Sequence, residues 1–290
     1  MSAGEAPFLG ANTELTLAAG ALFGATAGVV GTFALARRRS LLADVAAHAS
    51  LPGVCMAFLA GEALGLGGRN PLVLLCGATL TALLATWSVP RLARLRGVGP
   101  DGAIAVSLSF FFGLGAVLLS DIQTHDSGLQ GGIDHLLFGN AAATTRADLS
   151  TMAVIALACA ALVTLFFKEL AAVCFDEQHA AVLGIAVRPF DLLLLGLLVA
   201  TVVAGMQMAG IVLVVAMIIA PAAAARAVRG SLTRVTVVAG TVGAVAAAAG
   251  VLLSRSMQSM PTGSAMTLVA AAIFILSLVV APWRRQGVGA

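Results

Sequence analysis

The sequence predicts an all-α membrane protein: a polytopic bundle of eight or nine transmembrane helices that forms a single domain over residues 1–290. Hydrophobic residues make up 60% of the chain, charged residues only 10%, and the mean hydropathy is +1.04. Apolar runs of about 18 residues or more recur along the chain, and each is long enough to cross a bilayer. The N-terminal stretch has no basic segment before an apolar core, so we expect no cleavable signal peptide.

Nine apolar runs predict the spans. In chain order they cover roughly residues 13–36, 41–64, 71–90, 101–120, 150–167, 190–207, 209–228, 235–254 and 264–282. The count falls to eight if the first run is re-entrant or lies along the membrane interface.

The basic residues predict the orientation of these spans. Thirteen of the 16 Lys and Arg residues follow the odd-numbered runs, and the other three, Arg69, Arg146 and Arg255, follow the even-numbered ones. Because positive residues are enriched in cytoplasmic connections, we expect a cytoplasmic C-terminus, with residues 121–149 outside and residues 168–189 inside. The net charge of +3 therefore reflects topology, and we expect no nucleic-acid partner.

The outward connection, residues 121–149, contains a candidate metal patch. Two His–Asp neighbours occur there, His125 with Asp126 and Asp134 with His135. Polar residues are ordinary in a surface loop, so a solvated loop is the favoured explanation and a metal site the alternative.

The inward connection, residues 168–189, predicts a short amphipathic helix. Asp176 and Glu177 favour its N-terminus, and Gly184 is placed to end it. Spanning the membrane does not require a helix here, so the segment is either a solvated connector or a docking element for a cytoplasmic partner.

The run Leu41–Ala60 carries the main candidate site. Asp44 and His48 lie four residues apart, so a helix places both on one face. Pro52 cannot donate to the carbonyl of residue 48, and with Gly53 it predicts a helix kink. Ionisable groups inside a membrane span are costly and indicate function. Carboxylate and imidazole together suit zinc, manganese or iron.

Two further polar residues are candidates for an ion path. Glu62 follows the Asp–His pair toward the expected outer side, where it extends the path or lies at headgroup level. Gln207 stands in the short break between the sixth and seventh runs, which a plain tight turn also explains.

Nucleotide-binding and hydrolase motifs are missing from the chain. Lys168 is the only lysine and no GxxxxGK[ST] surrounds it, nor does HExxH or GxSxG occur. We therefore expect a transport subunit that is not an enzyme and holds no permanent cofactor. Energy for uphill transport would come from a partner or an ion gradient.

Several stretches together resemble the permease subunit of bacterial ABC importers for zinc, manganese and iron, the ABC-3 family. The matching stretches, in family order, are LLADVAAHASLPGVCMAFL (41–59), DGAIAVSLSFFFGLGAVLLS (101–120), IDHLLFGN (133–140), KELAAVCFDEQHAAVLGI (168–185), GIVLVVAMIIAPAAAARAV (210–228) and PTGSAM (261–266). The most specific is D-x-x-x-H-x-x-L-P-G, from Asp44 to Gly53. A departure is Ala43, where the family commonly has Gly.

The resemblance implies a type II importer-like permease in the bacterial inner membrane. It implies two such chains over two cytoplasmic ABC ATPase subunits, with an extracytoplasmic metal-binding protein delivering the ion. By the same analogy Asp44 and His48 match the pore metal site. The segment that matches the helix seated in the ATPase includes Phe175, Asp176, Glu177, Val182, Leu183 and Gly184.

Two other functional classes compete with this interpretation. An ion-gradient-coupled secondary transporter would use Asp44 and His48 as a proton or ion relay. That class predicts inverted repeats, and no second D-x-x-x-H occurs in the later half. A membrane scaffold without transport leaves the Asp–His pair unexplained.

Overall fold

The computed structural model describes residues 11–65, 71–125, 144–228, 230–257 and 260–286, and within these ranges the chain forms helices and no strands. This confirms the predicted all-α bundle. The helices are α1 (Ala11–Ala36), α2 (Leu41–Ala63), α3 (Pro71–Leu92), α4 (Gly99–His125), α6 (Arg146–Leu165), α7 (Phe167–Phe175), α8 (Glu177–Val182), α9 (Val187–Ala209), α10 (Ile211–Ala225), α11 (Leu232–Ser256) and α12 (Thr262–Gln286).

Among the described residues, eight helices are long and apolar enough to cross a membrane, and α10 is the apolar helix that falls short. Its 15 residues extend about 22 Å, less than the roughly 30 Å of a bilayer core. Gly210, with φ of 85°, separates α10 from α9. The eight-span alternative attributed the missing span to the first run, but α1 has 26 residues and is long enough.

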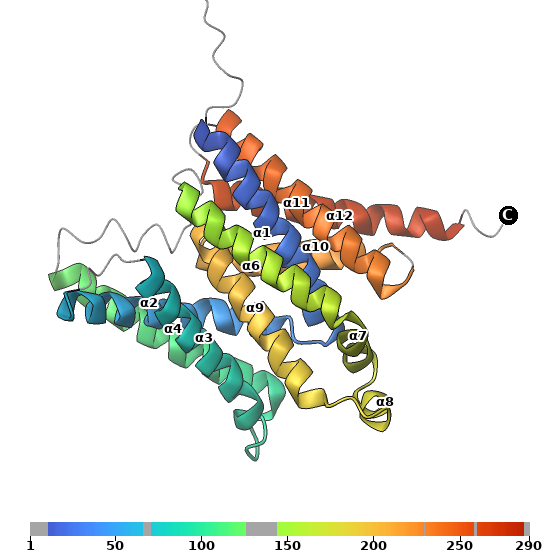
Figure 1. The fold of residues 1–290 in the computed structure, drawn as a ribbon, viewed down its shortest axis with the longest axis horizontal. Coiled ribbons are helices and arrows are strands. Elements are labelled where there is room, and N and C mark those ends of the chain that lie inside the picture. Colours follow the sequence, from blue (N-terminus) through green and yellow to red (C-terminus); the bar gives the residue numbers. More distant parts are fainter. Residues whose placement is uncertain (1–10, 66–70, 126–143, 229, 258–259, 287–290) are drawn as a thin grey trace, which may run out of the picture.

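The helices form two groups that meet at α9 and α10. On one side α2, α3 and α4 pack together; on the other, α1, α10, α11 and α12 pack together (Figure 1). Helix α9 contacts members of both groups, and α10 also contacts α2. The short helices α7 and α8 lie where α6 ends and α9 begins (Figure 1).

Small residues allow the closest helix contacts. A Cβ added at Gly24 of α1 would collide with the backbone carbonyl of Gly243 in α11, and the reverse substitution meets Gly24 in the same way. Interfaces of small residues are typical of membrane helices, because close backbone approach replaces the hydrophobic driving force that lipid removes. The α1–α11 pair is therefore fixed at backbone contact.

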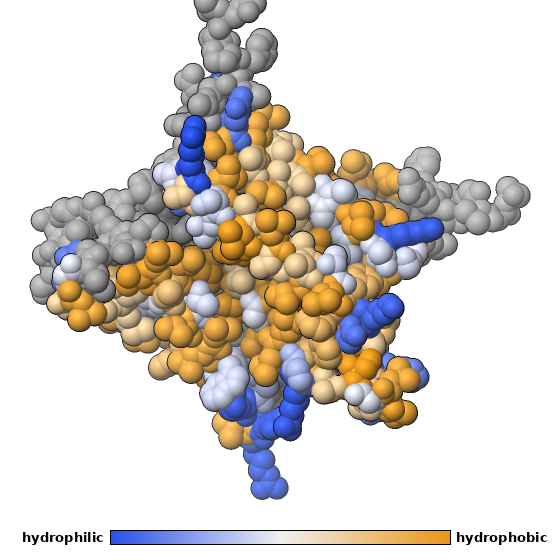
Figure 2. Space-filling view, in the orientation of Figure 1, coloured by the Kyte–Doolittle hydropathy of each residue, from blue (hydrophilic) through white to orange (hydrophobic). Residues whose placement is uncertain are grey.

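Much of the surface between the helix ends is apolar. Figure 2 shows hydrophobic residues over most of the face in view and hydrophilic residues gathered toward helix ends. Leu80, Val117 and Leu157 are each between 68% and 69% exposed. Such a surface matches a lipid environment rather than water.

Candidate functional site

Asp44 and His48 lie on one face of α2, as predicted from their spacing. His48 Nε2 is 3.4 Å from Asp44 Oδ1. This is longer than a strong hydrogen bond, so the contact is loose. The side chains are 20% and 35% exposed, respectively, whereas most neighbouring residues of the helix are buried. The pair therefore lies on the open edge of an otherwise packed helix.

One copy of the chain offers two ligands at this position. In the part of the chain that the structure describes, no group of three or more His, Cys, Asp and Glu side chains could hold a metal ion. Tetrahedral zinc takes four ligands, and other transition metals take at least as many. A full coordination shell at Asp44 and His48 thus needs donors from elsewhere.

Helix α2 is held firmly against its neighbours around this pair. The ring of Phe112, from α4, meets the His48 ring edge-on at 5.2 Å. A Cβ added at Gly53 would collide with the Gly77 carbonyl and with the Thr81 hydroxyl of α3. Helix α2 continues through Pro52 and Gly53. Gly53 thus permits close packing against α3, while the kink stays a prediction.

The other predicted polar residues do not join the pair in the described structure. Glu62 is exposed in the last turn of α2, 14 positions after His48 and hence about 21 Å farther along the axis. Gln207 lies in the last turn of α9, but its side chain is outside the described residues. Of the loop patch, Asp126, Asp134 and His135 fall outside the described residues, as does the side chain of His125.

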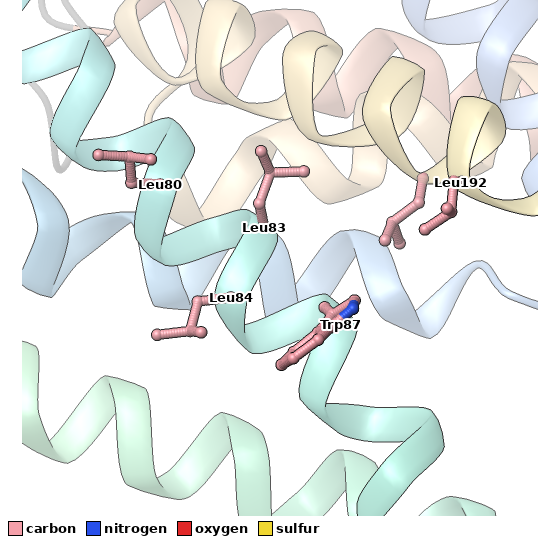
Figure 3. Close-up of a pocket in the computed structure, with 6 residues that line it drawn as sticks. Leu80, Leu83, Leu84, Trp87 and Leu192 are labelled. Carbon is pink, nitrogen blue, oxygen red and sulfur yellow. The ribbon is translucent and has the colours of Figure 1, made fainter. Parts of the chain in front are cut away.

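An apolar groove lies between α3 and α9, separate from the pair (Figure 3). Its volume is about 350 Å³, and it is lined by Leu80, Leu83, Leu84, Trp87, Leu192 and Leu195. The guanidinium of Arg91 stacks 3.0 Å above the Trp87 ring. With no carboxylate, imidazole or thiol in its lining, the groove has no metal-binding chemistry.

The inward connection forms two helices where the sequence predicted one. Helix α8 begins and ends as predicted: Asp176 accepts from the N–H groups of Gln178 and His179, and Gly184 has φ of 79°. Helix α7 precedes it and was missed, because Phe166 and Phe167 continue the fifth run across the break between α6 and α7. Leu170 and Val173 of α7 are buried in the bundle.

Three apolar side chains of this connection face outward. Phe175 is 76% exposed, Val182 84% and Leu183 61%. A groove of about 270 Å³ lies beside Phe175, with Arg226 and Leu232 in its lining. We define the predicted docking surface as Phe175, Val182 and Leu183.

A cluster of ion pairs lies behind the docking surface, and sequence reasoning missed it. Arg37 pairs with Asp191 and Glu177, and Arg39 also pairs with Asp191. Burial lowers the pKa of Arg37, but the charges and hydrogen bonds of Asp191 and Glu177 outweigh it and raise the pKa overall. The three consecutive arginines were a usable signal, but they were interpreted only as a topology marker.

Cys174 lies beside this cluster. Burial raises the pKa of its thiol to about 11. The thiol is therefore protonated at neutral pH in the metal-free protein.

Comparison with known proteins identifies the family. The model of the ABC 3 transport family matches residues 12–281. The chain belongs to this family.

Relatives with similar sequences are named for metals. The manganese transport system membrane protein MntC of Bacillus subtilis is 42% identical over 273 residues, 94% of this chain. The chain spans only 62% of that relative's length. The zinc transport system membrane protein TroC of Treponema pallidum is 33% identical over 278 residues, 93% of this chain and 92% of TroC.

A solved structure supports the same assignment. In PsaBC from Streptococcus pneumoniae in complex with Fab, one chain superposes on this one with a TM-score of 0.81 and 33% identity, covering 94% of this chain and 92% of that one. The predicted resemblance to the ABC-3 family and the predicted permease fold are therefore confirmed. The chain is a multi-pass protein of the bacterial inner membrane and an ABC permease.

Proposed function

We propose that the chain is the permease subunit of an ABC importer that carries a divalent transition metal into the cytoplasm. ATP hydrolysis takes place in a separate subunit. Family membership supports permease function, and the names of the manganese and zinc relatives support the class of cargo. The metal is cargo, so the site must bind it reversibly.

The observation that carries this proposal is the open Asp44–His48 pair. It supplies one carboxylate and one imidazole, and both remain partly exposed in a single chain. A second copy that brings its own α2 alongside would complete a set of two carboxylates and two imidazoles. Each half-site alone is incomplete, which suits transport because the ion must leave as well as enter.

The docking surface supports a cytoplasmic ATPase as partner. Phe175, Val182 and Leu183 are large apolar side chains that a water-soluble partner would need to bury. The loop 121–149 would face the extracytoplasmic protein that delivers the metal. The donor set suits manganese, zinc and iron(II) alike, and affinity alone does not select among them.

The test is metal uptake by the chain reconstituted in liposomes with its ATPase and with the extracytoplasmic metal-binding protein. The parent should accumulate radiolabelled manganese, zinc or iron(II) only when ATP is supplied. Asp44→Ala and His48→Ala should each lower uptake by at least the roughly 10- to 100-fold that loss of a supporting residue costs a metal site. The amount of ATPase that copurifies with each variant should match that of the parent. Asp44→Asn keeps the shape of the side chain and separates charge from packing.

Asp101→Asn is the matched control, because Asp101 is also an acidic residue in the first turn of a spanning helix, α4. It should transport at the parent rate. If both alanine variants also carry metal at the parent rate, the pair is structural. Uptake that needs a proton gradient and no ATP would instead establish the secondary-transporter alternative.

A further inference from the structure

The side chain of Arg37 joins three helices from the end of a fourth. Its Nε and Nη2 donate to the two oxygens of Asp191 in α9, at 3.0 and 3.1 Å. Nη1 donates to the carbonyl of Val173 at 3.0 Å, in the last turn of α7 where carbonyls lack partners within the helix. Nη2 also donates to Glu177 Oε2 of α8 at 2.9 Å.

These contacts fall on both sides of a helix break. Asp176 is extended, with φ of −151°, and separates α7 from α8. Val173 lies before this break and Glu177 after it, so the guanidinium sets the angle between the two helices. Arg39 adds a third hydrogen bond to Asp191, at 3.0 Å.

Helix α8 has few other attachments. Ala180 is its only buried residue, and the helix packs mainly against α7 and α9. Val182, its one large apolar residue, belongs to the docking surface. The ion pair between Arg37 and Glu177 links α8 directly to the end of α1, with the Glu177 side chain 58% exposed.

The same turn leads into the metal-bearing helix. Arg39 N–H donates to the Ala34 carbonyl and Arg38 N–H to that of Leu35, which closes α1 with a Schellman motif. Arg38 has φ of 56°, a conformation that favours glycine, so an arginine in this turn adds backbone strain. Helix α2 starts at Leu41, and Asp44 is in its first turn.

We propose that Arg37 is a positioning residue that ties the docking helix α8 to the first turn of α2, and thereby couples ATPase movement to the Asp44–His48 pair. This inference rests on the proposed function. The guanidinium side chain is 10% exposed and Asp191 20%, so the pair is largely withdrawn from water. Removing Arg37 leaves Asp191 paired with Arg39 alone and breaks the contact with Glu177 of α8. Lysine cannot reproduce the bidentate contact of the guanidinium with Asp191.

The experiment measures the metal ions taken up per ATP hydrolysed by the reconstituted complex. Arg37→Gln should lower this ratio about tenfold, within the range by which single residues alter coupling, while ATP hydrolysis and recovery of the ATPase stay near the parent values. Arg37→Lys keeps the charge and should give an intermediate ratio. Combining Arg37→Gln with Glu177→Gln should lower the ratio little further, because both break the ion pair that links α8 to the end of α1.

Arg38→Gln is the matched control. It removes one positive charge from the same turn and therefore has the same effect on orientation, but Arg38 makes none of the ion pairs of the cluster. Its ratio should stay within about twofold of the parent.

An unchanged ratio in Arg37→Gln overturns the proposal, and so does loss of the ATPase from the complex, which would make Arg37 an assembly residue. If Arg37→Gln cannot be produced, Arg37→Lys decides by the same criterion. A parent complex without ATP-driven uptake would refute the proposed function instead. In that case amide hydrogen exchange still tests the contact of Arg37 with α7 and α8. The amides of residues 173–183 should exchange faster in Arg37→Gln than in the parent, and at the parent rate in Arg38→Gln.

Discussion

Two acidic residues of α2 show how position decides chemistry at the scale of single residues. Asp44 lies one turn from His48, and the helical period alone predicted that their side chains meet. Glu62 has similar chemistry but lies about 21 Å farther along the helix, so it cannot share an ion with the pair. The sequence could define half of the site. It could not show the remaining donors, because no described residue of the same chain supplies them.

Gly53 is a position in α2 that leaves no room for a larger side chain. A Cβ there would meet the backbone of Gly77, which cannot move aside as a flexible side chain would. We expect Gly53→Ala to destabilise the protein by about 2 kcal/mol or more, the cost typical of overpacking. The measurement is the thermal unfolding of the purified protein in detergent.

Gly196 of α9 provides the comparison, since no atom lies within 4 Å of an added Cβ there. Gly196→Ala should leave stability unchanged or raise it by up to about 1 kcal/mol, because alanine favours the helix. Equal effects of the two substitutions would contradict the close contact between α2 and α3.

At the scale of elements, the connection between α6 and α9 shows what local sequence conveys. The start and end of α8 followed from Asp176 and Gly184, whose preferences are local. The break at Phe166, which separates α7 from α6, has no such signal because apolar residues continue across it. The Arg37–Asp191 pair was also hidden, since its partners are 154 positions apart.

The docking surface gives a prediction for an element. Phe175→Ala should weaken binding of the ATPase about tenfold, as expected when a central aromatic residue is removed from an interface. It should leave metal binding at Asp44 and His48 intact. Recovery of the ATPase with the purified permease measures the effect.

Leu165→Ala is a suitable control, because Leu165 is 71% exposed but lies in the spanning helix α6. Its ATPase recovery should match the parent. A Phe175→Ala variant with normal recovery and normal uptake would show that another surface docks the partner.

At the scale of the whole molecule, composition predicted the class of fold and most helix positions. Hydropathy located α10 as well, but it did not reveal that this helix has only 15 residues. Its length depends on Gly210, whose positive φ ends α9, and on packing against α1, α11 and α12. Both depend on the tertiary structure, which a hydropathy profile does not contain.

The orientation gives a prediction for the whole chain. If the positive connections are cytoplasmic, a cysteine introduced at Ser127 should react with a membrane-impermeant maleimide in intact cells, whereas Arg96→Cys should react only after permeabilisation. The parent, with its four native cysteines, provides the background. Labelling of Arg96→Cys alone in intact cells would reverse the topology and move the docking surface outside.

The glycine contact between α2 and α3 has a consequence for how the permease moves. Backbone contact leaves no room for α2 to rotate within its group, and α4 packs mainly on α2 and α3. We therefore expect the three helices to swing as one rigid body, with α9 and α10 as the sliding boundary. Asp44 and His48 would then move together with the helices that surround them. The pore would open by separation of the α2–α3–α4 groups of two copies of the chain rather than by rearrangement of the ligands.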